Sequence, residues 1–299
     1  MAEDKINAEV DLPQPSADNG SSDQIRRVFE VLDRKVKLNP LVKMKEALVS
    51  LKDGREGEIN VRNESTVFGF DTNALVNIGN QEKGDDIIDF LKRQKNVVIP
   101  GQVIQETWNF IRKSTQNQNQ NQNLINIRRM QKEDVESIRN LLGDDKSRHA
   151  SELLQELRNL FEEYQPQTDT KYLNSLISTI SSLEATAICP FVPRDSFLQL
   201  AEARNKTNTP PGFRDSDKNH GDYFVWADFL LGVYILDNLS IENIVLVTND
   251  TKNDWSTKGV AHPILGAEVE ALCKKRFQLW DLKQFSDYVK LNIDSNHLQ

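Results

Sequence analysis

The 299-residue sequence has only two cysteines, few aromatic residues (7%) and no long apolar run. Cys189 and Cys273 lie in apolar contexts without metal-ligand spacing, so we expect reduced core thiols rather than a disulfide, and therefore a cytoplasmic protein. No apolar run approaches the ~20 residues of a membrane-spanning helix, and the polar start Met1–Asp4 has no signal-peptide core. We therefore expect no membrane association. A Gly-rich phosphate loop is also absent, which excludes nucleotide-hydrolase and dinucleotide-binding functions.

Positive charge is in deficit as well. The chain has 37 Lys and Arg against 45 Asp and Glu, for a formal net charge of −8. This balance argues against sequence-blind adhesion to phosphate backbones. Any contact with nucleic acid must be local, bridged by a metal, or helped by a partner.

The composition changes along the chain and divides it into three parts. Residues 1–22 are rich in Pro, Ser and Asp with little to bury, and we expect a disordered tail. Apolar residues at helical spacing from about Ser22, followed by a second helical pattern over Pro40–Leu51, predict an N-terminal helical extension over residues 23–60. Residues 61–299 alternate strand and helix patterns, which predicts an α/β domain with a parallel sheet.

Four apolar runs predict the strands of this sheet, namely residues 66–70, 96–99, 243–248 and 277–280. Between the second and third runs, a charged segment with helical spacing predicts a helical insertion over about residues 111–185. It opens on the Gln- and Asn-rich stretch Gln116–Asn123, which is typical of a solvated linker.

Acidic residues stand where these elements end or begin. Asp71 and Asp250 each follow a strand, Asp222 begins an apolar helix, and Glu106 lies on the helix after the second strand. Four carboxylates at one edge of a sheet would repel each other unless cations neutralised them. An all-oxygen ligand set suits Mg²⁺ or Mn²⁺, and such ions support hydrolysis of a phosphodiester.

Each acid also has a simpler interpretation. Asp71 and Asp222 could be helix N-caps, Glu106 a surface acid and Asp250 a turn residue. Spacing alone leaves these alternatives open.

Several motifs in order resemble the PIN-domain nucleases. They are Phe70-Asp71-Thr72-Asn73, Pro100 with Glu106, Gly221-Asp222 and Thr248-Asn249-Asp250. The runs Pro210-Pro211-Gly212-Phe213-Arg214-Asp215 and Lys252 to Trp255 are similar to the bacterial PIN-like branch with a long helical insertion. The resemblance covers roughly residues 64–285. It implies a three-layer α/β PIN-like fold with a central parallel sheet, and Mg²⁺- or Mn²⁺-dependent endoribonuclease activity, with toxin, RNA-processing and phage-defence roles among relatives.

By this resemblance, the catalytic and metal-binding acids are Asp71, Glu106, Asp222 and Asp250, and Asp254 is an additional metal-binding acid of the branch. The resemblance makes Asn73 and Thr248 polar supports, while Asp215 and Lys218 either shape their loop or touch a substrate phosphate. The implied partner is nucleic acid, RNA rather than DNA. The N-terminal extension would bind a regulatory protein or a second copy of the chain.

The same residues also allow other functions and structural roles. A non-catalytic PIN scaffold, a binding module with the same acids, is the competing class, and aspartyl-nucleophile phosphatase chemistry lacks its second acid two residues after Asp71. Asp228 is expected on the surface or in a structural pair, and His220 in a structural role. Trp108, Trp226 and Trp255 could stack a base, but core packing is the preferred interpretation for each.

Overall fold

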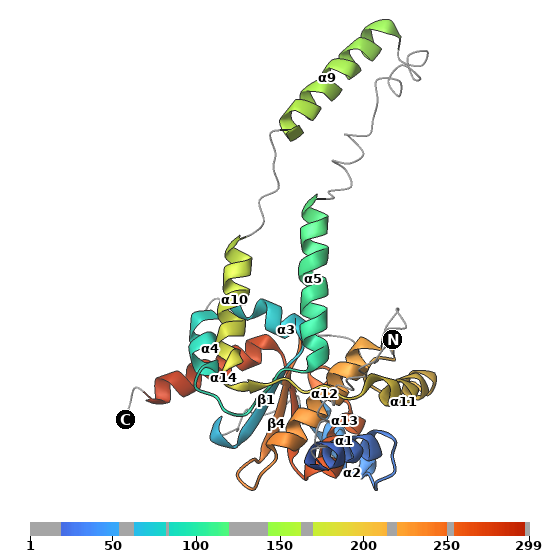
Figure 1. Cartoon of the computed structure of the whole chain (residues 1–299), viewed down its shortest axis with the longest axis vertical. Helices are drawn as coiled ribbons and strands as arrows, with labels where there is room; N and C mark the ends of the chain where they lie inside the picture. Colours follow the sequence, from blue (N-terminus) through green and yellow to red (C-terminus); the bar gives the residue numbers. More distant parts are fainter. Residues whose placement is uncertain are drawn as a thin grey trace, which may run out of the picture.

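The computed structural model of the chain describes residues 19–53, 63–81, 84–119, 143–162, 170–213, 220–249 and 254–296. At its centre is a five-stranded sheet in the order β3-β2-β1-β4-β7, in which every neighbouring pair is parallel. The strands are β1 (Thr66–Phe70), β2 (Val97–Val98), β3 (Ala187–Ile188), β4 (Asn243–Val247) and β7 (Arg276–Trp280). The chain steps from β1 through β2 to β3 and then returns to the other side of β1 (Figure 1). The strand order therefore reverses between β1 and β4, which is where open parallel sheets bind ligands.

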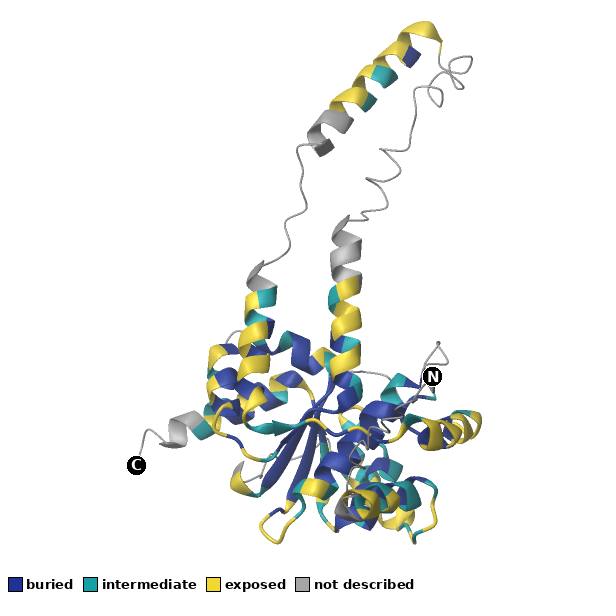
Figure 2. Ribbon diagram, viewed as in Figure 1, coloured by how far each residue is buried: buried dark blue, intermediate teal, exposed yellow. Residues whose placement is uncertain are grey.

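The sheet separates two apolar layers, because successive side chains of a strand point to opposite faces. In β1, Val67 packs in one core cluster and Phe68 in the other, and Ile244 and Val245 of β4 divide in the same way. Figure 2 shows these strands buried along their length. The fold is the three-layer α/β architecture that the resemblance implied.

Helices cover both faces. The layer beside Val67 contains α1 (Asn19–Leu32), α11 (Arg194–Lys206), α12 (Gly221–Leu236) and α13 (Pro263–Cys273). The layer beside Phe68 contains α3 (Thr72–Asn77), α4 (Gly84–Leu91), α14 (Leu282–Asn296) and the end of α10 (Thr170–Glu184). Short 3-10 turns, η1 (Asn63–Ser65) and η2 (Ile78–Asn80), precede β1 and follow α3.

The two helices of the N-terminal extension pack differently on the domain. α1 buries Val28 in the core cluster, whereas α2 (Pro40–Asp53) lies against α13 without a buried residue and leaves Leu48 57% exposed. α1 begins at Asn19, three residues before the helix start predicted at about Ser22. Residues 1–18 lie outside the described part of the chain.

The insertion is helical wherever the structure describes it. α5 (Gly101–Asn119) and α10 project from the same end of the body, and α9 (Asp144–Glu162) lies between them in sequence (Figure 1). α5 is buried at its start and exposed further along (Figure 2). Residues 116–119, which were predicted to begin a linker, form the end of α5.

Several short strands and one helix of the described residues were not predicted from the sequence. They are β3, the antiparallel hairpin of β5 (Ser256–Thr257) and β6 (Val260–Ala261), and α14. The strands are two residues long, too short for a periodicity signal, and their pairing is set by neighbouring strands. The sequence of α14 does carry a helical signal, because Phe285, Tyr288 and Val289 follow the i, i+3, i+4 spacing of one helix face. In the structure all three side chains are buried.

Two expectations from composition can be compared with the structure. Both cysteines are free thiols, but only Cys273 is buried, so the prediction of a core position is wrong for Cys189. Burial raises the pKa of the Cys273 thiol to about 11. In the described part of the chain, no helix is long and apolar enough to cross a membrane.

The packing of α14 predicts a large loss of stability on truncation of Phe285. Its ring centroid lies 5.5, 5.1 and 5.9 Å from those of Phe68, Phe70 and Phe90. We expect Phe285→Ala to lower the free energy of unfolding by about 3–5 kcal/mol, because it opens a cavity in this ring cluster. Urea denaturation followed by circular dichroism measures the change.

Leu239→Ala is the control, since that side chain is fully exposed. Its free energy of unfolding should change by less than about 0.5 kcal/mol. Equal losses in the two variants would contradict the position of α14 against the sheet.

Candidate functional site

The carboxyl ends of β1 and β4 meet where the strand order reverses. Asp71 follows β1, and its N–H donates to Val247 O at 3.0 Å, which extends the strand pairing to this residue. Thr248 follows β4, and its hydroxyl donates a hydrogen bond to Asp71 Oδ2. Asp71 Oδ1 accepts from the Ala74 N–H at 2.6 Å and caps α3. Asp71 is therefore an N-cap, and because a carboxylate can accept about four hydrogen bonds, this role is compatible with cation binding.

Two neighbours hold the Glu106 carboxylate on the second turn of α5. Thr72 Oγ1 donates to Glu106 Oε2 at 2.6 Å, and Gln102 Nε2 donates to Glu106 Oε1 at 3.0 Å. Gln102 lies four residues before Glu106, so both side chains share one helix face. Since Thr72 follows Asp71 directly, these bonds hold Glu106 at the end of β1.

Glu106 also contacts the start of α12. A β-carbon at Gly221 would lie 2.6 Å from Glu106 Oε1, so only glycine allows the carboxylate to approach this closely. Asp222, the next residue, is partly exposed in the first turn of α12. The segments that carry Asp71, Glu106 and Asp222 therefore meet around Thr72 and Gly221.

A partly buried ion pair, between the buried Asp228 and the partly exposed Arg194, fixes the start of α5 on α12. Asp228 is fully buried, and both of its oxygens accept from the Arg194 guanidinium at 2.9 Å. Asp228 also accepts from the N–H groups of Gln102 and Val192, each at 2.8 Å. Burial raises the pKa of the Asp228 carboxyl, and the hydrogen bonds and charge of Arg194 oppose that shift. Asp228 is thus a structural pair and not a surface residue, and it anchors the helix turn that carries Gln102.

Asp254 lies apart from these contacts. It is fully buried, and its Oδ2 accepts from the Gly212 N–H at 2.9 Å. Its Oδ1 has no hydrogen-bond partner among the described residues.

Asn73, one of the two predicted polar supports, bonds within α3. Its side-chain oxygen accepts from Asn77 Nδ2 at 2.9 Å.

The remaining predicted site residues, Asp250, Asp215 and Lys218, lie outside the described part of the chain. Among the residues that the structure does describe, no three His, Cys, Asp or Glu side chains form a group that could hold a metal ion. The available donors nevertheless suit a hard cation. These donors are carboxylate oxygens, which such cations prefer. Because Gly221 has no β-carbon, Glu106 Oε1 can lie close to the start of α12.

The aromatic residues divide between core and surface. Trp226 and Trp255 are 0% and 2% exposed, as predicted, but Trp108 is 69% exposed, so the core prediction is wrong for that residue. His220 is buried just before α12 with a positive φ of 50° and makes no side-chain cap hydrogen bond.

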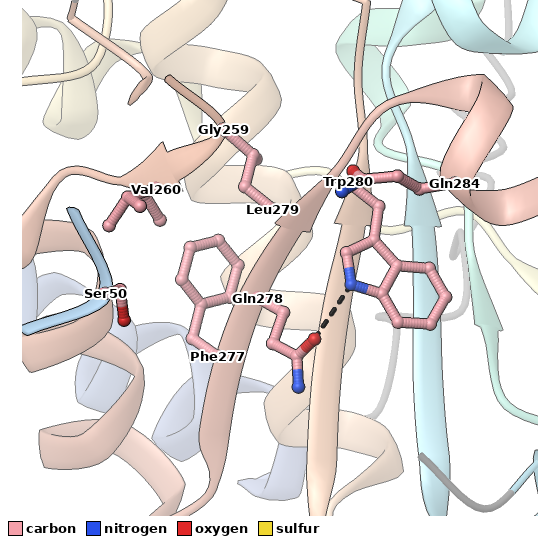
Figure 3. Close-up of a pocket in the computed structure, with 9 residues that line it drawn as sticks. Ser50, Gly259, Val260, Phe277, Gln278, Leu279, Trp280 and Gln284 are labelled. Carbon is pink, nitrogen blue, oxygen red and sulfur yellow. Dashed lines mark hydrogen bonds between the residues drawn. The ribbon is translucent and has the colours of Figure 1, made fainter. Parts of the chain in front are cut away.

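A groove lies on the outer side of β7, lined by residues of β7, the β5–β6 hairpin and α2 (Figure 3). Trp280 Nε1 donates to Gln278 Oε1 at 2.8 Å on its wall. Of the predicted acids that the structure describes, namely Asp71, Glu106, Asp222 and Asp254, none lines this groove.

Sequence reasoning assigned no contact with Glu106 to Thr72, Gln102 or Gly221, although Thr72 and Gly221 belong to motifs that carry the resemblance. A signal was present for two of them, because Thr72 adjoins Asp71 and Gln102 lies one helical turn from Glu106. The contact between Gly221 and Glu106 has no local signal, since it joins two helices far apart in the sequence.

The fold and this edge define an α/β domain with acidic groups at the strand reversal of a parallel sheet. A family model described as "PIN like domain" matches residues 67–265. The chain belongs to the PIN-like domain family, which confirms the resemblance. PIN-like domains are generally nucleases that use divalent metals. Neither a curated protein nor a solved structure matches the chain.

For the nuclease activity that is general among PIN-like domains, the close approach at Gly221 predicts a lower rate in Gly221→Ala. The added β-carbon overlaps Glu106 Oε1 and must displace that carboxylate. A displacement of about 1 Å can reduce catalysis about 100-fold, so we expect a loss of that order in kcat with little change in thermal stability. Cleavage of labelled RNA and a thermal melt measure the two quantities.

Gly266→Ala in α13 is the matched control. Its β-carbon would lie 3.5 Å from the nearest atom, an ordinary contact, so activity should stay at the wild-type value. Full activity of Gly221→Ala would show that the position of Glu106 does not matter for cleavage.

Proposed function

We propose that this protein is a metal-dependent nuclease, specifically an endoribonuclease that hydrolyses phosphodiester bonds. Membership of the PIN-like family supports the class of enzyme. The observation that carries the proposal is the contact of Glu106 with both Thr72 and Gly221, which links the segments of Asp71 and Asp222. In the sequence, Asp250 directly follows Asn249, the last residue after β4 that the structure describes.

The proposed ligands of Mg²⁺ or Mn²⁺ are the carboxylates of Asp71, Glu106, Asp222 and Asp250. When bound, such an ion supplies an activated water and neutralises charge that develops on the phosphodiester. The protein's own contribution is orientation. Thr248 holds one oxygen of Asp71, and Thr72 and Gln102 hold both oxygens of Glu106, in the manner of outer-shell supports.

The acidic balance of the chain bears on the substrate. A net charge of −8 leaves little general attraction for a phosphate backbone, so contacts at the site itself must provide the affinity. Lys218 and Lys252 are the proposed local cations, with Asp215 shaping the loop of Lys218. RNA is the proposed substrate, and a toxin or phage-defence effector is the proposed biological role.

One observation favours the alternative of a non-catalytic binding module. Both oxygens of Asp71 accept hydrogen bonds within the protein, as a purely structural N-cap would. Titration with Mn²⁺ and incubation with labelled single-stranded RNA and DNA separate the alternatives. Metal binding with cleavage of RNA supports the endoribonuclease, and cleavage of DNA alone indicates a DNA-directed nuclease.

The proposal predicts that Asp71→Asn abolishes cleavage while the fold persists. Asn Oδ1 can still accept from the Ala74 N–H and cap α3, so we expect a loss of stability of no more than about 1 kcal/mol. The neutral amide is a poor ligand for a hard cation. Calorimetric titration with Mn²⁺, RNA cleavage and a thermal melt test the three expectations.

Asp89→Asn replaces an exposed acid outside the site and should leave all three quantities unchanged. Excess EDTA should stop cleavage by the wild-type protein. Cleavage that continues in EDTA, or in Asp71→Asn, would refute the metal-dependent mechanism.

A further inference from the structure

A second ion pair, with both partners buried, lies beneath the turn that follows α11. Arg204 of α11 and Glu268 of α13 are 5% and 0% exposed. Arg204 Nη1 donates to Glu268 Oε1 at 2.6 Å, and Arg204 Nη2 donates to Glu268 Oε2 at 3.3 Å. None of the sequence motifs pointed to this pair.

The pair reaches two segments that lead to the candidate site. Arg204 Nη2 also donates to the carbonyl oxygen of Pro210, in the turn after α11. Glu268 Oε2 accepts from Trp226 Nε1 at 2.8 Å. Trp226 lies four residues after Asp222 on α12, so the pair fixes the helix face that bears this predicted ligand.

Asp254 holds the same turn from its other end. Its Oδ2 accepts from the N–H of Gly212, whose φ of +89° is a conformation that glycine adopts without strain. Arg34, at the end of α1, donates to Thr209 Oγ1 at 3.2 Å, so the N-terminal extension contacts this turn as well.

Stability alone is a poor explanation for these charges. A buried ion pair is often no more stabilising than apolar residues of the same volume, because desolvation offsets the attraction. What the charges provide is geometry, since a guanidinium donates in fixed directions to a carboxylate and a carbonyl together.

We propose that Arg204, Glu268 and Asp254 form a positioning clamp on the Pro210–Gly212 turn and the first turns of α12, and that Asp254 is an anchor rather than a metal ligand. The clamp sets the position of Asp222 relative to Glu106. The expected effect of the clamp on kcat rests on the proposed nuclease function. Its effect on the positions of the turn and of α12 does not.

Asp254→Asn and Asp254→Ala separate an anchor from a ligand. Asn keeps an acceptor for the Gly212 N–H, so Asp254→Asn should retain the kcat and the Mn²⁺ affinity of the wild type. Ala removes the acceptor, and kcat should fall about 10–100-fold, as for other outer-shell supports. A loss of Mn²⁺ affinity in Asp254→Asn equal to that in Asp254→Ala would make Asp254 a ligand and overturn the assignment.

The double variant Arg204→Met/Glu268→Leu tests the ion pair without leaving a buried charge alone. We expect it to fold, to exchange the Gly212 amide hydrogen faster than the wild type, and to lose kcat while KM for RNA is unchanged. Lys43→Met/Glu270→Leu removes a different ion pair, which joins α2 to α13 with an N–O distance of 3.6 Å, and should change none of these quantities.

Wild-type hydrogen exchange at Gly212 and wild-type kcat in Arg204→Met/Glu268→Leu would overturn the clamp. Failure of the proposed function has a different result, namely no cleavage by the wild-type protein. In that case hydrogen exchange and Mn²⁺ titration still decide whether the clamp holds the turn and whether Asp254 binds metal.

Discussion

The parallel pairing of β1 with β4 is the constraint on which the site depends. It continues through the bond from the Asp71 N–H to Val247 O and ends with the Thr248 hydroxyl on the Asp71 carboxylate. Because the strand order reverses at this pair, the connections that follow β1 and β4 run to opposite sides of the sheet. The carboxyl ends of the two strands are left between them, next to α3, α5 and α12. The register of two strands thus decides where the first predicted acid stands.

Helix α12 connects this sheet edge to the surrounding helices through buried hydrogen bonds. It is apolar and buried from Tyr223 to Val233, so a charged or polar side chain on this segment is stabilised by a partner inside the protein. Asp228 satisfies this need with Arg194 and the start of α5, and Trp226 with Glu268. These bonds fix the rotation of α12 and its distance from α5. Glu106 and Asp222 are consequently placed by buried residues that take no part in chemistry.

Much of the fold could be predicted because its signals are local. The strands β1, β4 and β7 and the helix α13 follow from short apolar runs and their periodicity, and the order of the motifs gave the family. β3 and the β5–β6 hairpin escaped prediction because two-residue strands exist only through their neighbours. Of the site, the sequence predicted which acids to examine. It did not predict their supports, because Thr72, Gln102 and Gly221 act across three separate elements.

The amino-acid sequence alone determined the α/β class with a parallel sheet, the helical insertion, the deficit of positive charge and the acids at element ends. These properties depend on residue type and spacing within a short window. The tertiary structure alone decided that Asp71 caps α3 and that Glu106 rests against Gly221. It also decided that Asp228 is buried and that Trp108 is exposed. Such facts depend on which helices pack against each other. The local sequence around an acid or a tryptophan is the same whether its side chain faces water or another helix.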